Sequence, residues 1–337
     1  MTQTLDFSSF DALRAQLARG LPAADLAASD KAQARQDSLT KPQGSLGRLE
    51  DIACFIAGWQ GTERPHLDHA QAIVFAGNHG VVAQGVSPFP AEVTALMVAN
   101  FEAGGAAINQ LCRAGGATLS VVPLELERPT GDITQTPAMS EAETLAAMAR
   151  GAAAFDPQAD ILLLGEMGIG NSTIAAALAA GLFGGAGADW TGPGTGMDTA
   201  GVAHKARVVD AALARHPDRA DGLATLAALG GREQAAIAGA VLAARMARVP
   251  VLLDGFICTA AAATVAGWGG LDHCIAAHVS AEPGHARLLE AVGLTPILSL
   301  GMRLGEGSGA ALALPLIRAA IAVHDGMATF AEAGITA

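Results

Sequence analysis

Short apolar runs alternate with amphipathic stretches along most of the chain. Residues 161–164 (ILLL) form one such run, and similar runs occur near 71–76, 118–123 and 249–253. Runs of this length are typical of buried strands, and the stretches after them repeat apolar residues at helical spacing. This β, α, β, α order predicts an α/β fold with a mostly parallel sheet flanked by helices on both faces.

The first 60 residues show a different pattern. Residues 5–38 repeat apolar positions at helical spacing on both sides of Pro22, and 46–59 are amphipathic. We therefore predict a peripheral helical arm before the first strand. Lys41 and Arg48 lie in or next to the turn ahead of its last helix; they are either anion ligands or, as is more usual for basic residues, solvent-exposed charges.

A glycine-rich turn follows the run at 161–164 and leads into an alanine-rich helix. Its glycines are Gly165, Gly168 and Gly170, and the helix is opened by Asn171, Ser172 and Thr173. The free N–H groups and the positive dipole end of such a helix suit an anion. Asn171 stands where a Walker-type loop has its lysine, so a monophosphate suits the loop better than a triphosphate. The alternative is a turn that only packs the helix on the sheet.

Polar residues gather where the predicted strands end, and in a parallel sheet these ends meet at one edge. The set comprises Asn78, His79, Ser87, Glu166, residues 171–173, Lys205, Asp254, Ser280, Glu282 and Glu306. Glu306 lies between glycines in an apolar segment. Loss of solvation there raises proton affinity and suits a carboxylate to act as a base near neutral pH. The alternative is an exposed charge at a helix start.

Composition narrows the classes of partner. Of the 337 residues 51% are hydrophobic, 15% charged and 4% aromatic, and the formal charge is −12 with a pI near 5.1. This balance excludes the basic surface of a nucleic-acid-binding protein and favours a small-molecule partner. No uninterrupted apolar run reaches the roughly 20 residues of a membrane span, and the N-terminus does not resemble a signal peptide. We expect a cytoplasmic protein without membrane contact.

Cysteine and histidine spacing gives no sign of a metal centre. Cys54, Cys112, Cys258 and Cys274 are far apart in sequence and lack C-x-x-C spacing, so we expect reduced core thiols. His66 and His69 are three residues apart, but PHLDH reads as a loop. We expect no metal site there and no cofactor.

Six motifs occur in order along the chain: KPQGSLGRLE (41–50), AGNHGVVAQGVSPFPAEVTALMV (76–98), GEMGIGNST (165–173), PVLLDGF (250–256), SAEPGH (280–285) and MRLGEGSGAALALPLI (302–317). Together they resemble the nicotinate-nucleotide:dimethylbenzimidazole phosphoribosyltransferase family of cobalamin lower-ligand synthesis. The resemblance runs from Leu39 to Ala328. It implies a homodimeric pentosyltransferase with a Rossmann-like sheet in a large domain (61–317) and a small helical domain from both chain ends (1–60 and 318–337).

The resemblance also implies a reaction and its residues. The 5-phosphoribosyl group of nicotinate mononucleotide moves to 5,6-dimethylbenzimidazole, giving α-ribazole 5′-phosphate and nicotinate, with Glu306 as general base. The residues implied to bind the ribose and phosphate are Glu166, Gly168, Gly170, Asn171, Ser172, Thr173, Gly194 and Lys205. Those implied to line the base pocket are Ser87, Phe89, Met97 and Leu304. The chain carries Asn78 where many similar sequences have Asp, and Met97 where some have Gln.

Three alternatives stay open at this point. The same transfer could go to another acceptor, such as adenine or a phenol. The chain could also be a non-catalytic sensor of nicotinate mononucleotide, although sensing alone gives no reason to bury a base. A dinucleotide oxidoreductase fits least, because it needs G-x-G-x-x-G and an acid about 20 residues further on.

Overall fold

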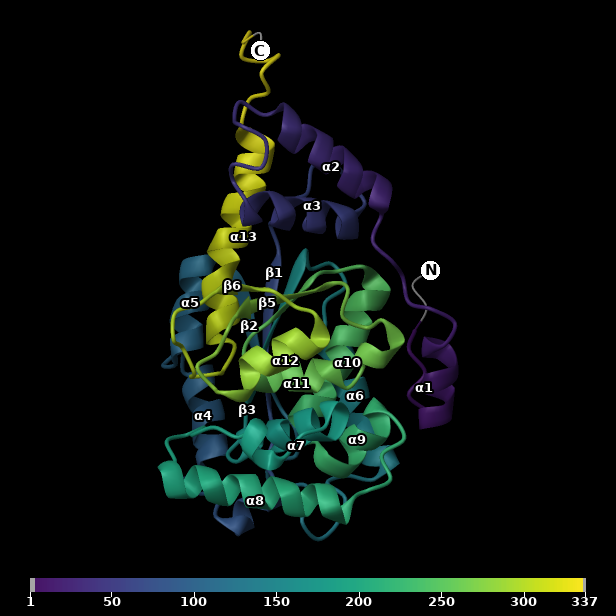
Figure 1. Ribbon diagram of the computed structural model, residues 1–337, viewed down its shortest axis with the longest axis vertical. Helices are drawn as coiled ribbons and strands as arrows, with labels where there is room; N and C mark the ends of the chain where they lie inside the picture. Colours follow the sequence, from purple (N-terminus) through teal and green to yellow (C-terminus); the bar gives the residue numbers. More distant parts are fainter. Residues whose placement is uncertain (1–3, 336–337) are drawn as a thin grey trace.

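Six parallel strands form a single sheet in the computed structural model, which describes residues 4–335 (Figure 1). The strand order is β2-β1-β3-β4-β5-β6, and every neighbouring pair is parallel. The strands are β1 (Ala70–Ala76), β2 (Ala117–Pro123), β3 (Ile161–Met167), β4 (Val251–Leu253), β5 (Cys274–His278) and β6 (Pro296–Leu298). The predicted α/β fold is confirmed. The chain places β2 on one side of β1 and then β3 on the other side, so the direction in which strands are added reverses at β1. Open parallel sheets bind ligands beyond the carboxyl ends of their strands at such a reversal.

Thirteen α-helices belong to the described residues. They are α1 (Phe10–Leu17), α2 (Leu26–Ser38), α3 (Arg48–Gln60), α4 (Val93–Glu102), α5 (Ala107–Gly115), α6 (Glu141–Ala154), α7 (Asn171–Phe183), α8 (Thr199–Arg215), α9 (Gly222–Leu229), α10 (Arg232–Ala247), α11 (Phe256–Ala263), α12 (Gly284–Val292) and α13 (Ser308–Gly326). The expected start of α6 is confirmed, because the Ser140 hydroxyl accepts the Glu143 N–H and Glu143 accepts the Ser140 N–H.

Each face of the sheet carries its own apolar core. On β1, Ile73 and Phe75 pack with α6, α7, α10 and α11, whereas Ala72 and Val74 face α3, α5 and α13. Strands buried on both faces read as continuous apolar runs, which explains the sequence pattern. Helices α6 and α10 approach closely because each presents a glycine to the other: a Cβ on Gly151 would lie 1.8 Å from the carbonyl oxygen of Ala236.

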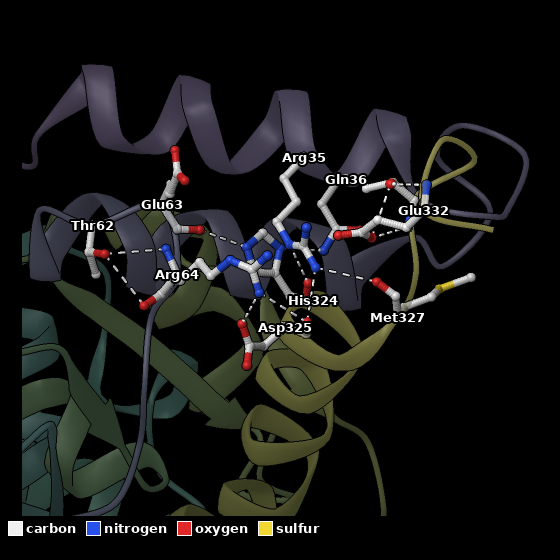
Figure 2. Close-up of polar contacts among 10 residues, drawn as sticks. Arg35, Gln36, Thr62, Glu63, Arg64, His324, Asp325, Met327 and Glu332 are labelled. Carbon is white, nitrogen blue, oxygen red and sulfur yellow. Dashed lines mark hydrogen bonds and ion pairs between the residues drawn. The ribbon is translucent and has the colours of Figure 1, made fainter. Parts of the chain in front are cut away.

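Helix α3, from the N-terminal part of the chain, meets helix α13, from the C-terminal part, above the sheet. Helix α2 packs on α3, and α3 packs on the second half of α13 (Figure 1). Figure 2 shows the polar contacts that join them: the Arg35 guanidinium donates to the backbone carbonyls of His324, Asp325 and Met327. Arg35 thereby satisfies carbonyls that the end of a helix leaves without partners.

Helix α1 lies apart from this group, although the sequence assigns it to the same small domain. Its N–H at Phe10 donates to Glu141 at 2.7 Å, and Arg14 pairs with Asp221 at 2.6 Å, so α1 packs on the main body. Residues 1–3 and 336–337, the outermost parts of the segments 1–60 and 318–337, lie outside the described residues.

The usual interpretation of Lys41 as a solvated charge is wrong. Its side chain is buried and pairs with the equally buried Glu50 at 2.8 Å. It is therefore a structural ion pair at the start of α3 and not a free anion ligand. Arg48 is half exposed and reaches the carbonyl of Thr295.

Two further expectations concern the apolar parts of the chain. All four cysteines fall within the described residues, where they are buried and unpaired, as expected for core thiols. Helix α13 is long and apolar enough to cross a membrane by length and composition alone. It packs against α3, α5 and strands β3, β5 and β6, and half of its most apolar window is buried.

Candidate active site

A cavity of about 630 Å³ opens beyond the carboxyl ends of the strands. The loops that follow β1, β3, β4, β5 and β6 all contribute to its wall, as the strand-end argument predicts. Its lining residues are Phe89, Val93, Met97, Glu166, Met167, Gly168, Ile169, Asn171, Ser172, Gly194, Thr195, Gly255, Phe256, Ile257, His278, Ser280, Glu282, Arg303, Leu304, Gly305 and Glu306.

Glu306 lies on this wall in a left-handed backbone conformation, with φ +63° between Gly305 and Gly307 at φ +80°. A non-glycine residue seldom adopts such a φ, and strain of this kind tends to occur at functional sites. The loop rests directly on β3: a Cβ on Gly165 would lie 2.7 Å from the nitrogen of Gly307. Burial, followed by the charge of Asp254, raises the pKa of Glu306 to about 7.

Asp254 fixes the position of this loop at the start of α13. Its carboxylate accepts the N–H groups of Gly307 at 3.1 Å and Ala310 at 3.0 Å. A carboxylate at a helix N-terminus satisfies free N–H groups and complements the dipole. Burial raises the pKa of Asp254, and His278 Nε2 lies 3.8 Å from its Oδ1.

Glu166 is a second buried carboxyl, at the end of β3. Its Oε2 accepts a hydrogen bond from the Asn171 side chain, and its Oε1 lies 3.4 Å from the Glu306 N–H. Burial, with smaller contributions from the charges of Asp254 and Glu233, raises the pKa of Glu166 to about 8. Glu166 and Glu306 therefore both bind a proton more tightly than ordinary glutamates.

The glycine-rich turn after β3 brings the start of α7 to the cavity. Gly170 is the N-cap residue at φ +88°, which favours glycine, and no side chain caps the helix. Ser172 lines the cavity, and its hydroxyl accepts a hydrogen bond from Lys205 Nζ at 3.0 Å. Lys205 also donates to the carbonyl of Gly192 at 2.9 Å, and burial lowers its pKa to about 8.

The second glycine-rich loop lies across from the first. At Gly194 the backbone has φ +52°, and a Cβ there would lie 2.5 Å from Ser172 Oγ. The N–H of Gly194 donates to Glu282 at 3.0 Å, and its carbonyl accepts from Arg303 at 2.8 Å. Burial raises the pKa of Glu282. Polar groups from the loops after β5 and β6 thus hold this backbone against the start of α7.

An apolar wall completes the cavity. Phe89, Met97 and Leu304 line it, and Phe89 and Leu304 are about half exposed at 48% and 56%. Ser87 lies just outside the lining, where its hydroxyl is 3.0 Å from that of Thr195. The arrangement gives an apolar surface suited to a flat ring, next to two carboxyls and a polar helix start.

The structure thus brings most of the predicted site residues to one cavity. Gly170, Thr173, Lys205 and Ser87 do not line it: Gly170 and Thr173 lie in the first turn behind its wall, and Lys205 lies behind Ser172. Sequence reasoning missed His278, Arg303 and Glu233. His278 ends β5, so the strand-end rule could have found it. Glu233, which pairs with His79 at 2.7 Å, lies in the first turn of α10 and gave no such signal.

Comparison with known proteins agrees with the resemblance. The family model described as "Phosphoribosyltransferase" matches residues 21–335. The chain is 62% identical over 323 residues to the nicotinate-nucleotide:dimethylbenzimidazole phosphoribosyltransferase of Rhodobacter capsulatus, covering 95% of this chain and 96% of the relative. It is 61% identical over 317 residues to the protein of the same name from Ruegeria pomeroyi, covering 94% of each chain.

A solved structure shares the fold. The crystal structure of CobT from Thermus thermophilus superposes with a TM-score of 0.86 at 42% identity, covering 92% of this chain and 99% of that one. Matches of this extent, together with the cavity at the strand ends, confirm the family that the motifs suggest. The chain belongs to the nicotinate-nucleotide:dimethylbenzimidazole phosphoribosyltransferase family.

Proposed function

We propose that this protein transfers the 5-phosphoribosyl group of nicotinate mononucleotide to 5,6-dimethylbenzimidazole, giving α-ribazole 5′-phosphate and nicotinate. The observation that carries the proposal is Glu306: a buried carboxyl on the cavity wall, held at φ +63°, with its pKa raised to about 7. A general base works best with a pKa near the operating pH.

Glu306 removes the proton from one imidazole nitrogen of the acceptor while the other nitrogen attacks the anomeric carbon. The bond from that carbon to the nicotinate nitrogen breaks, and its electron pair neutralises the pyridinium ring. The leaving group needs no acid, so a base and correct orientation suffice. Attack opposite the leaving group inverts the anomeric carbon, which accounts for an α product.

The phosphate belongs at the start of α7 in this proposal. Gly168, Asn171 and Ser172 line the cavity there, and helix N-termini bind phosphate through free N–H groups. Gly170 and Thr173 shape the turn from behind, while Gly194 closes on it from the second loop. Lys205 supplies positive charge through Ser172. Glu166 lies between this turn and Glu306, where the ribose would sit.

The acceptor ring belongs against the apolar wall of Phe89, Met97 and Leu304, with Ser87 at its edge. A wall of this kind selects by shape and contact more than by hydrogen bonds. The apolar wall therefore favours a second candidate function, in which the same transfer goes to another flat base or to a phenolic acceptor.

Nicotinate release from nicotinate mononucleotide tests the proposal. It is followed by chromatography with dimethylbenzimidazole, adenine, phenol or no acceptor. We expect release that depends on the benzimidazole and a new ribotide. Release with adenine or phenol alone would favour the second candidate. Binding of the nucleotide without release in any mixture would mean a sensor and would refute the transfer.

We further propose a homodimer that works in the cytoplasm. Leu96, Leu300 and Leu304 are 68%, 60% and 56% exposed, and a partner subunit would cover such side chains. Reduced buried cysteines suit a reducing compartment. Light scattering after size-exclusion chromatography measures the mass, and a monomer of 33.7 kDa would contradict the dimer.

A further inference from the structure

His66, Asp68 and Asp160 meet at the edge of the sheet where β1 and β3 begin. One nitrogen or oxygen donor from each lies within 4.8 Å of the other two. The active-site cavity lies at the other ends of the strands, so the function proposed above does not use these residues. We propose that they bind a divalent transition-metal ion of the Zn²⁺ class.

The spacing of the donors fits such an ion. His66 Nε2 and Asp160 Oδ1 are 3.2 Å apart. Tetrahedral zinc with bonds of about 2.0–2.2 Å places neighbouring ligand atoms roughly 3.4 Å apart. An ion can therefore enter between these two donors with little movement of either. Asp68, on the exposed side, supplies the third donor, and water takes the remaining position.

Asp160 is oriented before any ion arrives. Its Oδ2 accepts the N–H groups of Asp68 and His69, both at 2.7 Å, which leaves Oδ1 directed at His66. Its side chain is only 13% exposed. Hydrogen bonds that fix a ligating carboxylate are the usual support of a protein metal site.

The segment that carries the histidine is also fixed. Gln60, the last residue of α3, donates to the His66 carbonyl at 2.7 Å and accepts the His66 N–H at 3.0 Å. Leu67 is buried between the two exposed donors. Hydrogen bonds thus fix both ends of the segment 66–69. Binding an ion would therefore order few additional groups and cost little conformational entropy.

The donor set selects the kind of ion. Imidazole suits zinc, nickel and copper, whereas calcium and magnesium prefer all-oxygen sites. The spacing of His66 and His69 did not predict this site, because His69 is not one of its donors: the His69 ring lies 3.8 Å from Asp156. A bound ion would tie the end of the helical arm to the sheet, because His66 follows α3 and Asp160 precedes β3.

Zinc binding by the full-length protein tests the proposal. Calorimetry with Zn²⁺ alone is compared for wild type, His66→Ala and Asp68→Asn, with His69→Ala as the matched control. His66 and Asp68 are exposed, so their replacement leaves the fold intact, which circular dichroism verifies. We expect one ion per chain in wild type and His69→Ala, and affinity about tenfold or more weaker in the other two.

Two further readouts make the outcome unambiguous. Zinc should raise the melting temperature of wild type and His69→Ala but not that of His66→Ala, since a ligand stabilises the state it binds. X-ray absorption of bound zinc should show nitrogen and oxygen neighbours without sulfur. Unchanged affinity in His66→Ala, equal loss in His69→Ala, sulfur ligation, or no binding by wild type would each overturn the site.

Discussion

The backbone N–H of Glu306 lies 3.4 Å from Oε1 of Glu166, so the loop that carries one buried carboxyl rests on the other. The two groups come from segments 140 residues apart, yet the backbone of one contacts the carboxyl of the other. Both pKa values are raised, mainly by burial.

Glu306→Gln should remove most turnover and leave folding and nucleotide binding in place. The amide keeps the size of the side chain but accepts no proton, and one general base contributes about 10²- to 10⁴-fold. Nicotinate release with dimethylbenzimidazole measures the effect, and Glu290→Gln, at an exposed site on α12, is the control. Near wild-type turnover would mean that the base lies elsewhere, with Glu166 next in line.

The value of kcat/KM should rise with pH through about 7, because Glu306 accepts a proton only in its ionised form and its pKa is about 7. A glutamate with the ordinary value of 4.5 would be ionised already. The pH profile of kcat/KM reports groups of the free enzyme. A flat profile between about pH 5.5 and 7.5 would show that no such group limits the reaction.

Glu166 should contribute a decrease in the free energy of unfolding as pH rises from about 5 to 8. Burial raises the pKa of Glu166 to about 8, so across this range the folded chain binds more protons than the unfolded chain. The free energy of unfolding then decreases with pH. Urea midpoints measured across the range test this, and Glu166→Gln should flatten the dependence. An equally steep decrease in that variant would assign it to other groups.

Lys205→Met should weaken nucleotide binding while changing kcat little. Lys205 donates to Ser172 Oγ and is fully buried, so methionine fills its space without the charge. Loss of the positive charge behind Ser172 weakens the attraction for the phosphate and should raise KM by about tenfold or more. Because burial lowers the pKa of Lys205 to about 8, wild-type affinity should also weaken above that pH. The variant should lack this dependence; if it retains it, another group is responsible.

Gly151→Ala should destabilise the protein by about 1–3 kcal/mol, the usual cost of overpacking. Its Cβ would lie 1.8 Å from the Ala236 carbonyl oxygen, so α6 and α10 must separate. Gly326→Ala is the control: no atom of residues 4–335 lies within 4 Å of a Cβ built there, and alanine should stabilise by about 0.4–1 kcal/mol. Urea denaturation measures both, and equal effects would contradict the packing argument.

Much of the fold could be predicted because strands β1, β3, β4 and β5 are buried on both faces. Apolar runs such as 161–164 mark them directly, and Glu306 could be found from its flanking glycines. Contacts between residues that only the folded chain brings together could not be predicted. Nothing local pairs Lys41 with Glu50 in a buried site, and nothing local brings Asp160 to His66. Such pairs depend on the three-dimensional path of the backbone and leave no periodicity in the sequence.

The contacts of Arg35 set an order for assembly during synthesis. Arg35 donates to the carbonyl of His324, a residue that the ribosome adds 289 positions after Arg35. Helix α3, which packs on α2 and on α13, must therefore wait for α13 until nearly the whole chain has been translated. The loop of Glu306 directly precedes that partner helix, α13. A nascent chain released early lacks both the Arg35 contacts with α13 and the proposed base, Glu306. Incomplete translation products are therefore expected to be inactive.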